Sequence, residues 1–404
     1  MEPRDLNVTD KNRANHIVDR ALALDAGMAA TLLAEVLENF QGRHRNLLEI
    51  FEARADEMEN AFAAHSTFTV EQRRLIGAYF LNEYSFEAAA LFNPSIVAHL
   101  DQAGVPAGAR RFILSLRAVG EGHISSLTFR SGLVAADGAV SVDPSARLAS
   151  VPKIVTRNPG PDGDDVELAF SAEQDLSERV IFPVTHSQSN GIEDARFVEF
   201  NEDGQRTYYA TYTAYNGKAI RSELLETRDF LKFRMSPLRG AATRNKGMAL
   251  FPRRINGRYA MIARQDNENL YLIYSDDKYT WNDGGVAVLK PQFPWEFVQI
   301  GNCGSPIEID EGWLLLTHGV GPVRKYSIGA VLLDKNDPSK VLGRAREPLV
   351  KPEPSEREGY VPNVVYTCGA MRHNDQIVLP YAVSDTFSNF ATIEIAALMK
   401  LIGC

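Results

Sequence analysis

The residues best suited to chemistry lie in the segment Gly191-Ile192-Glu193-Asp194-Ala195-Arg196. Because successive side chains of a strand point to opposite faces, Glu193 and Asp194 are expected to point in opposite directions. One carboxyl group can then face a pocket while the other pairs with Arg196 or caps a backbone group. Burial in a pocket would raise the pKa of that carboxyl group toward the operating pH, as a general acid requires. A solvated turn with a surface ion pair is the alternative.

The sequence around this segment has the pattern expected of an all-β domain. From about residue 110, short runs of β-branched, aromatic and aliphatic residues alternate with turn pairs such as Asn256-Gly257 and Asp283-Gly284, and helical periodicity is nearly absent. The predicted strands are 111–117, 125–129, 208–213, 259–263, 269–274, 312–317, 327–333, 376–381 and 391–396.

A weak internal repeat suggests how these strands are grouped. A polar turn followed by an aromatic or aliphatic strand recurs at Asn256, Glu311 and Asn374, which gives units of about 50–60 residues. Such units fit the blades of a β-propeller, and the length available predicts five blades. A propeller places functional residues on loops around a central funnel. A two-sheet sandwich is the competing architecture.

The first hundred residues have a different pattern. Apolar residues recur at helical spacing over Met28–Phe40 and Leu47–Phe62, a threonine before Glu71 predicts a capped helix over 70–82, and Glu83–His99 suggests a shorter helical pair. We therefore expect a helical N-terminal extension over 1–100 and a five-bladed β-propeller catalytic domain over 101–404. The extension is expected to pack on the propeller or to form a contact between subunits.

Composition excludes several classes of function. The chain has 404 residues, 45% of them hydrophobic, and a net charge of −9. Without a run of basic residues, it is not expected to bind nucleic acid or an anionic membrane. No secretory signal and no apolar run of membrane-spanning length are visible, and the three cysteines lack metal-ligand spacing. These features predict a cytoplasmic protein with free thiols and no metal or cofactor.

Several motifs, in order along the chain, resemble those of glycoside hydrolase family 130, five-bladed propellers that act on β-mannosides, mostly by phosphorolysis. The resemblance runs from about residue 90 to the C-terminus and leaves the helical segment outside it. The matching stretches are Phe92-Asn-Pro-Ser, Gly191-Ile-Glu-Asp-Ala-Arg-Phe, Tyr212-Thr-Ala-Tyr215, Leu250-Phe-Pro-Arg-Arg-Ile-Asn-Gly-Arg-Tyr259, Gly312-Trp-Leu-Leu-Leu-Thr-His-Gly-Val320, Tyr326–Leu333, Asp337–Val341 and Glu356-Arg-Glu-Gly-Tyr-Val-Pro-Asn-Val-Val365.

The resemblance implies that Asp194 is the proton donor, acting through a sugar hydroxyl, while inorganic phosphate attacks the anomeric carbon from the opposite face. The product would be mannose 1-phosphate. One catalytic carboxylate then suffices, because phosphate needs no deprotonation. Basic residues must hold the phosphate, since arginine forks match its oxygens bidentately.

The residues at positions similar to the family's anion-binding set are Arg244, Asn245, Lys246, His318 and Tyr326. Without the resemblance, Arg244 and Lys246 are equally consistent with a solvated loop, His318 with a core histidine, and Tyr326 with a strand aromatic. The expected substrate-binding residues are Arg117, His123, Glu193, Arg196, Tyr215, Arg264, Glu358 and Asp385. His123 lies in a Gly-Glu-Gly-His insert that departs from the family pattern and could instead be a glycine-rich turn without a ligand.

Gln299 is a second departure, because phosphorylases of this family commonly carry a lysine there. A neutral amide removes one charge from the anion site, where an ion pair is worth roughly 1 to 4 kcal/mol. Three enzymatic and binding functions therefore remain open: a phosphorylase, an inverting β-mannosidase with Glu308, Glu356 or Glu358 as base, and a non-catalytic carbohydrate- or protein-binding propeller. The expected partners are a β-mannoside, phosphate and further copies of the chain in a homo-oligomer.

Overall fold

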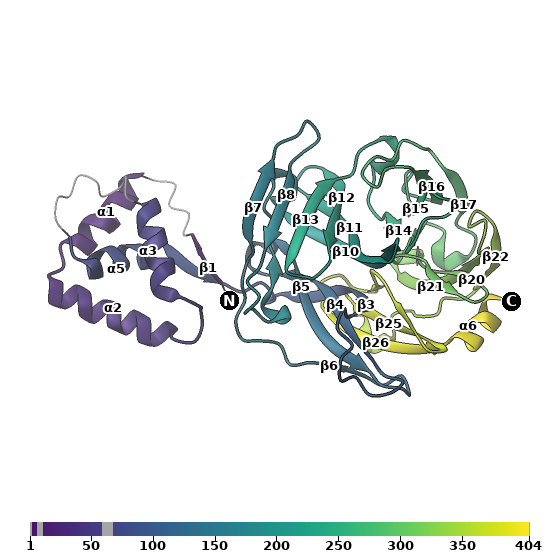
Figure 1. The fold of residues 1–404 in the computed structure, drawn as a ribbon, viewed down its shortest axis with the longest axis horizontal. Coiled ribbons are helices and arrows are strands. Elements are labelled where there is room, and N and C mark those ends of the chain that lie inside the picture. Colours follow the sequence, from purple (N-terminus) through teal and green to yellow (C-terminus); the bar gives the residue numbers. More distant parts are fainter. Residues whose placement is uncertain (1, 6–10, 59–67, 404) are drawn as a thin grey trace. The chain divides into compact units, whose positions relative to one another are not determined.

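The computed structural model describes residues 2–5, 11–58 and 68–403. The chain forms two compact units, Met1–Phe86 with Ala146–Ser150, and Glu87–Ser145 with Val151–Cys404. Figure 1 labels the elements of both.

The smaller unit is helical. It contains α1 (Lys11–Leu22), α2 (Ala26–Phe40), α3 (Leu47–Glu57), α5 (Val70–Tyr79) and the antiparallel pair β1 (Glu2–Asp5) and β2 (Leu81–Tyr84). Helix α5 begins with a capping box in which Thr69 accepts from the Gln72 amide while the Gln72 side chain accepts from the Thr69 amide. Apolar residues of three helices, such as Val18, Ala55 and Ile76, form its core.

One of the predicted helices is absent and another is confirmed over most of its length. The helical pair expected over Glu83–His99 is wrong, because β2 ends at Tyr84 and β3 (Ala90–Ala98) follows as a buried strand paired with its neighbour β4. Phe92, Ile96 and Val97 favour a strand, and tertiary pairing outweighed the apolar spacing. The predicted helix over Leu47–Phe62 is confirmed to Glu57, and positions 59–62 lie outside the described residues.

The larger unit is almost entirely β, as predicted. Its first sheet has eleven strands in the order β3-β4-β5-β10-β11-β12-β13-β8-β7, with β6 and β9 pairing β5. The remaining strands of this sheet are β4 (Arg110–Val119), β5 (Ser125–Val134), β6 (Val140–Val142), β7 (Lys153–Asn158), β8 (Asp165–Ala169), β9 (Val180–Ile181), β10 (Gly191–Glu202), β11 (Gln205–Tyr215), β12 (Ile220–Thr227) and β13 (Lys232–Pro237).

Three smaller antiparallel sheets follow along the chain. Asn256, Glu311 and Asn374, where the repeat was predicted, each precede the strand that leads a hairpin, namely β15, β20 and β25. The three sheets comprise β14 (Ala249–Leu250), β15 (Tyr259–Ala263), β16 (Leu270–Ser275) and β17 (Val286–Leu289); β18 (Gln299–Asn302), β19 (Ile307–Ile309), β20 (Gly312–Val320), β21 (Tyr326–Leu333) and β22 (Val341–Arg344); β23 (Val365–Tyr366), β24 (Met371–His373), β25 (Gln376–Val383) and β26 (Phe387–Glu394), before helix α6 (Ile395–Ile402).

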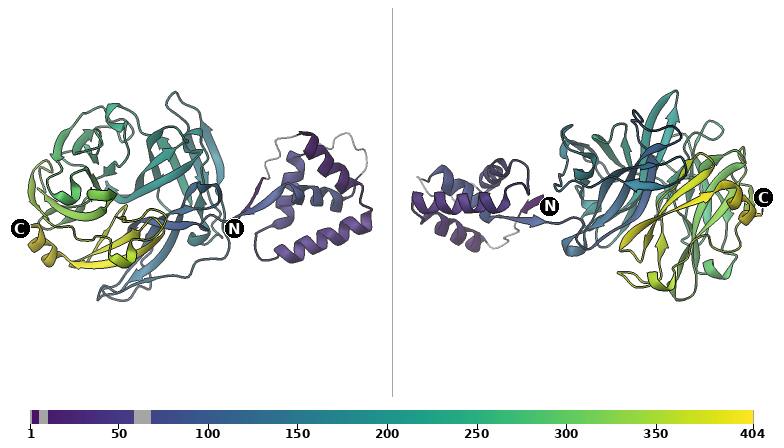
Figure 2. Two further views of the ribbon diagram at one scale, coloured as in Figure 1. Left: turned by 180° about the vertical axis from the view of Figure 1, so that it is seen from behind. Right: turned by 90° about the horizontal axis from the view of Figure 1, so that it is seen from below.

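The last sheet lies beside the first strand of the unit. The Leu91 amide donates to the Thr386 carbonyl at 3.0 Å, and the Cys368 amide donates to the Pro94 carbonyl at 2.7 Å. Figures 1 and 2 show β25 and β26, in yellow, next to β3. The last sheet of this unit therefore contacts its first strand.

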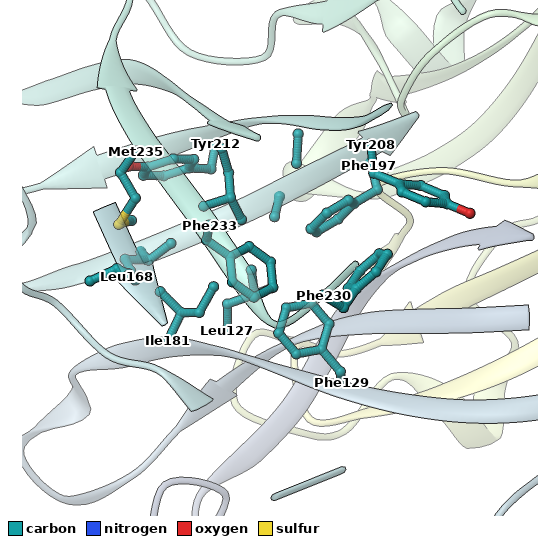
Figure 3. Packing of buried hydrophobic residues seen from close by; sticks show 14 of the residues in the cluster. Leu127, Phe129, Leu168, Ile181, Phe197, Tyr208, Tyr212, Phe230, Phe233 and Met235 are labelled. Carbon is teal, nitrogen blue, oxygen red and sulfur yellow. The ribbon is translucent and has the colours of Figure 1, made fainter. Parts of the chain in front are cut away.

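An aromatic core fixes the strand that carries the carboxylates. Phe197 of β10 packs against Phe129 of β5 and against Phe230, and Phe233 stacks on Phe129 with ring centroids 5.8 Å apart (Figure 3). Burying each such ring contributes roughly 1.5–3 kcal/mol, so β10 is held firmly on one face. That rigidity lets the start of the strand depart from regular geometry.

Candidate active site

Two β-bulges aim Asn93 and Asp194 at each other. The register of β3 against β4 shifts between Phe92 and Ser95, and that of β10 against β11 shifts between Glu193 and Arg196. Asn93 and Asp194 adopt left-handed backbone conformations, with φ of 48° and 54°. The Asn93 side-chain amide donates to Asp194 Oδ1 at 2.6 Å. Bulges re-aim side chains in this way and are over-represented next to active sites.

Asn93 was not among the predicted site residues, although its motif carried the resemblance. A local signal was present, because asparagine tolerates the left-handed region and Pro94 cannot donate to a strand ladder, which confines proline to edges and bulges. The sequence therefore indicated a bulge at Asn93. Its partner, 101 positions later in the chain, could not be read from that signal.

The bulge also overturns the prediction that Glu193 and Asp194 point in opposite directions. Both carboxylates reach the guanidinium of Arg117, which donates to Glu193 Oε1 at 2.9 Å and lies 3.6 Å from Asp194 Oδ1. Arg196 does not pair with either carboxylate as expected. Its Nη1 donates to the backbone carbonyl of Asp194 at 3.0 Å instead. An extra residue in the strand breaks the two-residue alternation on which the prediction depended.

The surroundings of Asp194 favour its charged form. Burial raises the pKa of this carboxyl group, but the charges of Arg117, Arg196 and Lys246 and the hydrogen bond from Asn93 together lower it below its usual value. The expectation that a pocket would raise the pKa of Asp194 is therefore wrong for the ligand-free protein. Nearby cations outweigh desolvation here.

A group of polar side chains lies beside Asp194. Arg196 donates to the hydroxyl oxygen of Tyr366 at 2.7 Å. The rings of His318, Tyr366 and Tyr326 contact one another, with centroid distances from His318 of 4.9 Å to Tyr366 and 5.7 Å to Tyr326. Burial raises the pKa of the Tyr366 hydroxyl well above its usual value, so Tyr366 keeps a proton that it can donate. Tyr366 was not predicted, because it sits in an ordinary-looking strand end.

Arg264 completes this group, directly after strand β15. Its side chain is only 6% exposed, yet among the described residues it has no hydrogen bond or ion pair, and its Nε is buried without a partner. Burial lowers the pKa of Arg264, and the nearby charge of Arg196 lowers it further. A buried guanidinium without a counterion is costly, so the protein holds a site that an anion would complete.

His318 is neutral in this setting. Burial holds its pKa well below the usual range, and the charges of Arg264 and Arg196 act in the same direction. The ring is accommodated because Gly301 faces it across the β18–β20 pair, where a Cβ atom would come within 2.2 Å of the imidazole. A neutral imidazole can offer one N–H and one lone pair to a ligand.

The predicted loop residues Arg244, Asn245 and Lys246 behave differently from one another. Lys246 lies 3.6 Å from Glu193 Oε2 and contributes to the potential at Asp194. Asn245 uses its side-chain oxygen to accept from the Lys246 amide and its carbonyl to accept from Ser222. Arg244 is exposed and lines a separate cavity of about 510 Å³. The structure thus brings only Lys246 of the three to the carboxylates.

Asp385 is the second carboxyl group near Asp194. It occupies the β25–β26 turn, where Ser384 and Asp385 both have φ near 50°. Burial and the charge of Asp194 raise the pKa of Asp385 to about 6, against the opposing effect of Arg117. Two carboxyl groups in unlike environments, one with a lowered and one with a raised pKa, are typical of a catalytic centre.

The remaining predicted substrate ligands lie at the edge of the group. Tyr215 pairs with Gly191 at the start of β10. His123 and Glu358 are exposed on loops, and His123 stacks on the ring of Tyr360. Gln299 pairs with Val320, and His318 with Gly301, so the alternation of β18 and β20 places Gln299 on the face that carries His318.

Trp295, an aromatic that could have stacked on a sugar ring, and Glu308, one of the possible bases, have structural roles. Trp295 packs under Gly319 and Gly329 and donates its indole N–H to the Arg346 carbonyl. Glu308 forms a bidentate pair with Arg253, at 2.9 and 3.0 Å, in a different cavity. Neither residue is available as a sugar-stacking face or a catalytic base beside Asp194.

The described part of the chain contains no group of histidine, cysteine or acidic residues able to hold a metal ion, and no helix long and apolar enough to cross a membrane. Cys303 and Cys368 are buried free thiols, in agreement with the prediction, and Cys404 lies outside the described residues.

Comparison with known proteins decides the family. A family model described as beta-1,4-mannooligosaccharide phosphorylase, glycoside hydrolase family 130, matches residues 169–403. The chain belongs to glycoside hydrolase family 130. It is 35% identical over 224 residues to a 1,2-beta-oligomannan phosphorylase of Thermoanaerobacter sp., covering 54% of this chain and 73% of that protein. It is also 30% identical over 227 residues to a beta-1,2-mannobiose phosphorylase of Listeria innocua, covering 54% of this chain and 62% of that protein.

Among solved structures, the Listeria innocua beta-1,2-mannobiose phosphorylase in complex with beta-1,2-mannobiose has a TM-score of 0.56. The sequence identity is 22%, over 78% of this chain and 92% of that one, which shows a shared fold. This family 130 member is therefore a glycoside-active enzyme, and Arg264 lies within the matched region together with Glu193, Asp194 and Asp385.

Proposed function

We propose that this chain cleaves β-mannosides by inverting phosphorolysis and releases mannose 1-phosphate. The observation that carries the proposal is Arg264, a buried guanidinium with no partner among the described residues, next to Arg196 and His318 and within electrostatic reach of Asp194. An arginine fork matches phosphate oxygens bidentately. The relatives, which are mannoside phosphorylases by name, support the same reaction.

In the proposed reaction, phosphate is held by Arg196, Arg264, His318 and the hydroxyl groups of Tyr326 and Tyr366. A phosphate oxygen forms a bond to the anomeric carbon as the glycosidic C–O bond breaks on the opposite face. The leaving oxygen receives a proton that originates from Asp194. Phosphate already carries its negative charge, so no second carboxylate is needed as a base, in contrast to an inverting hydrolase.

The electrostatics suggest how the proton and the nucleophile are coordinated. In the ligand-free protein, burial raises the pKa of Asp194, but nearby cations, including Arg196, outweigh burial and lower it. A bound phosphate dianion would offset those cations and raise the pKa of Asp194 toward the working pH. Asp194 would then carry its proton only when phosphate is bound.

A five-bladed propeller is the architecture that best supports this placement. Strands β5 and β10 are joined through only one residue pair, Ser125 with Gly191, so the eleven-stranded sheet divides naturally into two. With the three later sheets, this gives five groups of strands. Each of the five groups contributes at least one site residue, which fits a funnel lined by all five groups.

Hydrolysis is the second candidate, favoured by Gln299 on the face that carries His318. Of the three bases considered from sequence, Glu308 is committed to Arg253, Glu356 accepts a hydrogen bond from the Glu353 amide, and Glu358 is exposed on a loop. Incubation with β-1,2- and β-1,4-mannobiose, with and without phosphate, tests both. Mannose 1-phosphate that forms only with phosphate supports phosphorolysis, and free mannose at equal rates in both would overturn it.

A further inference from the structure

Two exposed rings from distant loops meet at the edge of the carboxylate group. His123 and Tyr360 lie with ring centroids 5.8 Å apart and planes inclined by 20°, which is a stacked arrangement. Tyr360 is 63% exposed. Exposed aromatic rings are usually solitary, so a stacked pair that leaves so much surface open needs a reason.

The loop of His123 is held in one shape. It follows β4, and Gly122 and His123 both adopt left-handed conformations, with φ of 71° and 57°. The His123 amide donates to the Gly120 carbonyl at 3.2 Å. Two residues later Ser125 pairs with Gly191, at the start of the strand that carries Asp194. The ring is therefore fixed close to the mouth of the site.

The segment of Tyr360 is tied to the turn that carries Asp385. The Tyr360 amide donates to Thr386 Oγ1 at 3.1 Å, and the Val361 amide donates to the Ser384 carbonyl at 3.0 Å. Gly359 permits this approach, since a Cβ atom there would lie 2.6 Å from Ser384 Cβ. The stack thus bridges the two segments that flank Asp194 and Asp385.

The geometry of an inverting displacement determines which part of the substrate would contact the His123–Tyr360 stack. The anion-binding residues Arg264, His318 and Tyr366 are all buried, whereas the His123–Tyr360 stack is open to solvent. In an inverting displacement the nucleophile and the leaving group lie on opposite faces of the anomeric carbon. With the nucleophile on the buried side, the leaving sugar must lie on the open side.

We propose that the His123–Tyr360 stack is a platform for the leaving-group sugar, on which the apolar face of that ring lies during cleavage and during reverse synthesis. The inference rests on the proposed function. It assigns these two residues a positioning role and not a catalytic one, and it names the ligand as a neutral hexose or the reducing end of a mannoside chain.

The experiment measures the reverse reaction, with mannose 1-phosphate as donor and mannose as acceptor. Tyr360→Ala should raise KM for the acceptor about tenfold. The KM for mannose 1-phosphate should stay within about twofold, because the buried anion site is untouched. Tyr360→Phe should behave like the wild type, and His123→Ala should share the acceptor defect. Tyr79→Ala, an exposed aromatic of the helical unit, is the matched control.

A double variant, His123→Ala with Tyr360→Ala, tests whether the rings act as one unit. Its defect should equal that of Tyr360→Ala alone, since each ring needs the other. Equal acceptor KM values for the wild type and Tyr360→Ala would overturn the inference while leaving phosphorolysis intact. A wild-type protein that makes no product from mannose 1-phosphate and any hexose would instead overturn the proposed function.

Discussion

The arginines near the two ends of strand β10 differ in whether they have an ion-pair partner. At the start of β10, Arg264 and Arg196 lie buried near Asp194, and Arg264 has no partner among the described residues. Farther along the same strand, Phe197 and Val198 line a cavity of about 470 Å³ with Arg253, whose guanidinium is paired bidentately with Glu308. The strand rise places these regions about 10 Å or more apart.

The difference separates a structural cation from a functional one. A paired, partly exposed arginine such as Arg253 contributes little beyond its local contact. A buried arginine without a counterion costs stability, and a bound anion would supply the missing charge. The unpaired arginine lies within electrostatic reach of Asp194, whereas the paired one is held by Glu308.

The largest expected effect is on catalysis at the unpaired end. Asp194→Asn removes the proposed proton donor while keeping the oxygen that accepts from Asn93, so kcat for phosphorolysis should fall by about 10²–10⁴-fold. Phosphate binding should persist, because the arginines remain. Steady-state rates with β-mannobiose check this, and a variant with more than a tenth of wild-type kcat would show that the proton comes from elsewhere.

Stability should respond oppositely to the loss of the two arginines. Arg264→Met replaces an uncompensated buried charge with an apolar side chain, and the free energy of unfolding should rise by about 1–4 kcal/mol in phosphate-free buffer. Arg253→Met should change it by less than about 1 kcal/mol or lower it. Urea unfolding of both variants tests the contrast. A loss of stability in Arg264→Met equal to that in Arg253→Met would mean that Arg264 is compensated after all.

Asp385 should make stability depend on pH. Its folded-state pKa of about 6 exceeds the unfolded value of 3.8, so the native state holds the proton more tightly, and stability falls as pH rises between these values. Asp385→Asn should remove this loss, about 2–3 kcal/mol at pH 7.5, and should change little at pH 3.5. Urea midpoints of wild type and variant at the two pH values give the comparison. An equal difference at both would exclude titration of Asp385 as the cause.

The smallest effect is expected at Gln299. A lysine at this position would place another cation on the face of His318, and KM for phosphate should fall by roughly tenfold. The matched change Gln292→Lys alters a residue outside the site and should leave KM for phosphate unchanged. If Gln299→Lys also leaves it unchanged, the Gln299 side chain does not face the anion.

How far the sequence could predict the site is clearest from particular residues. The resemblance placed Asp194 and His318 in matching motifs and gave Arg117 and Arg264 as substrate-binding residues, whereas the surroundings of Arg264 in the structure favour a phosphate ligand. The strands of the β unit were predictable from alternation and turn pairs. Glu83–His99 was not, since strand pairing decided a segment whose apolar spacing also fits a helix.

Tyr366 and Asn93 show what the sequence could not give. Tyr366 matters because its hydroxyl oxygen meets Arg196 from a strand 170 positions away, and Asn93 because two bulges bring it to Asp194. Tyr366 is not unusual in its segment, and the bulge signal at Asn93 does not reveal its partner. Arg244 shows the reverse, since a promising basic residue lies in an exposed position that lines another cavity.

The most direct test of the account is the affinity of the intact chain for phosphate, measured by isothermal titration calorimetry for the wild type, Arg264→Met and Arg253→Met. The account predicts that the wild type and Arg253→Met bind phosphate equally well, and that Arg264→Met binds it at least about tenfold more weakly, since a charged hydrogen-bond partner is worth roughly 1.5–3 kcal/mol. Equal affinity in Arg264→Met and the wild type would contradict the assignment of the unpaired arginine to the phosphate site.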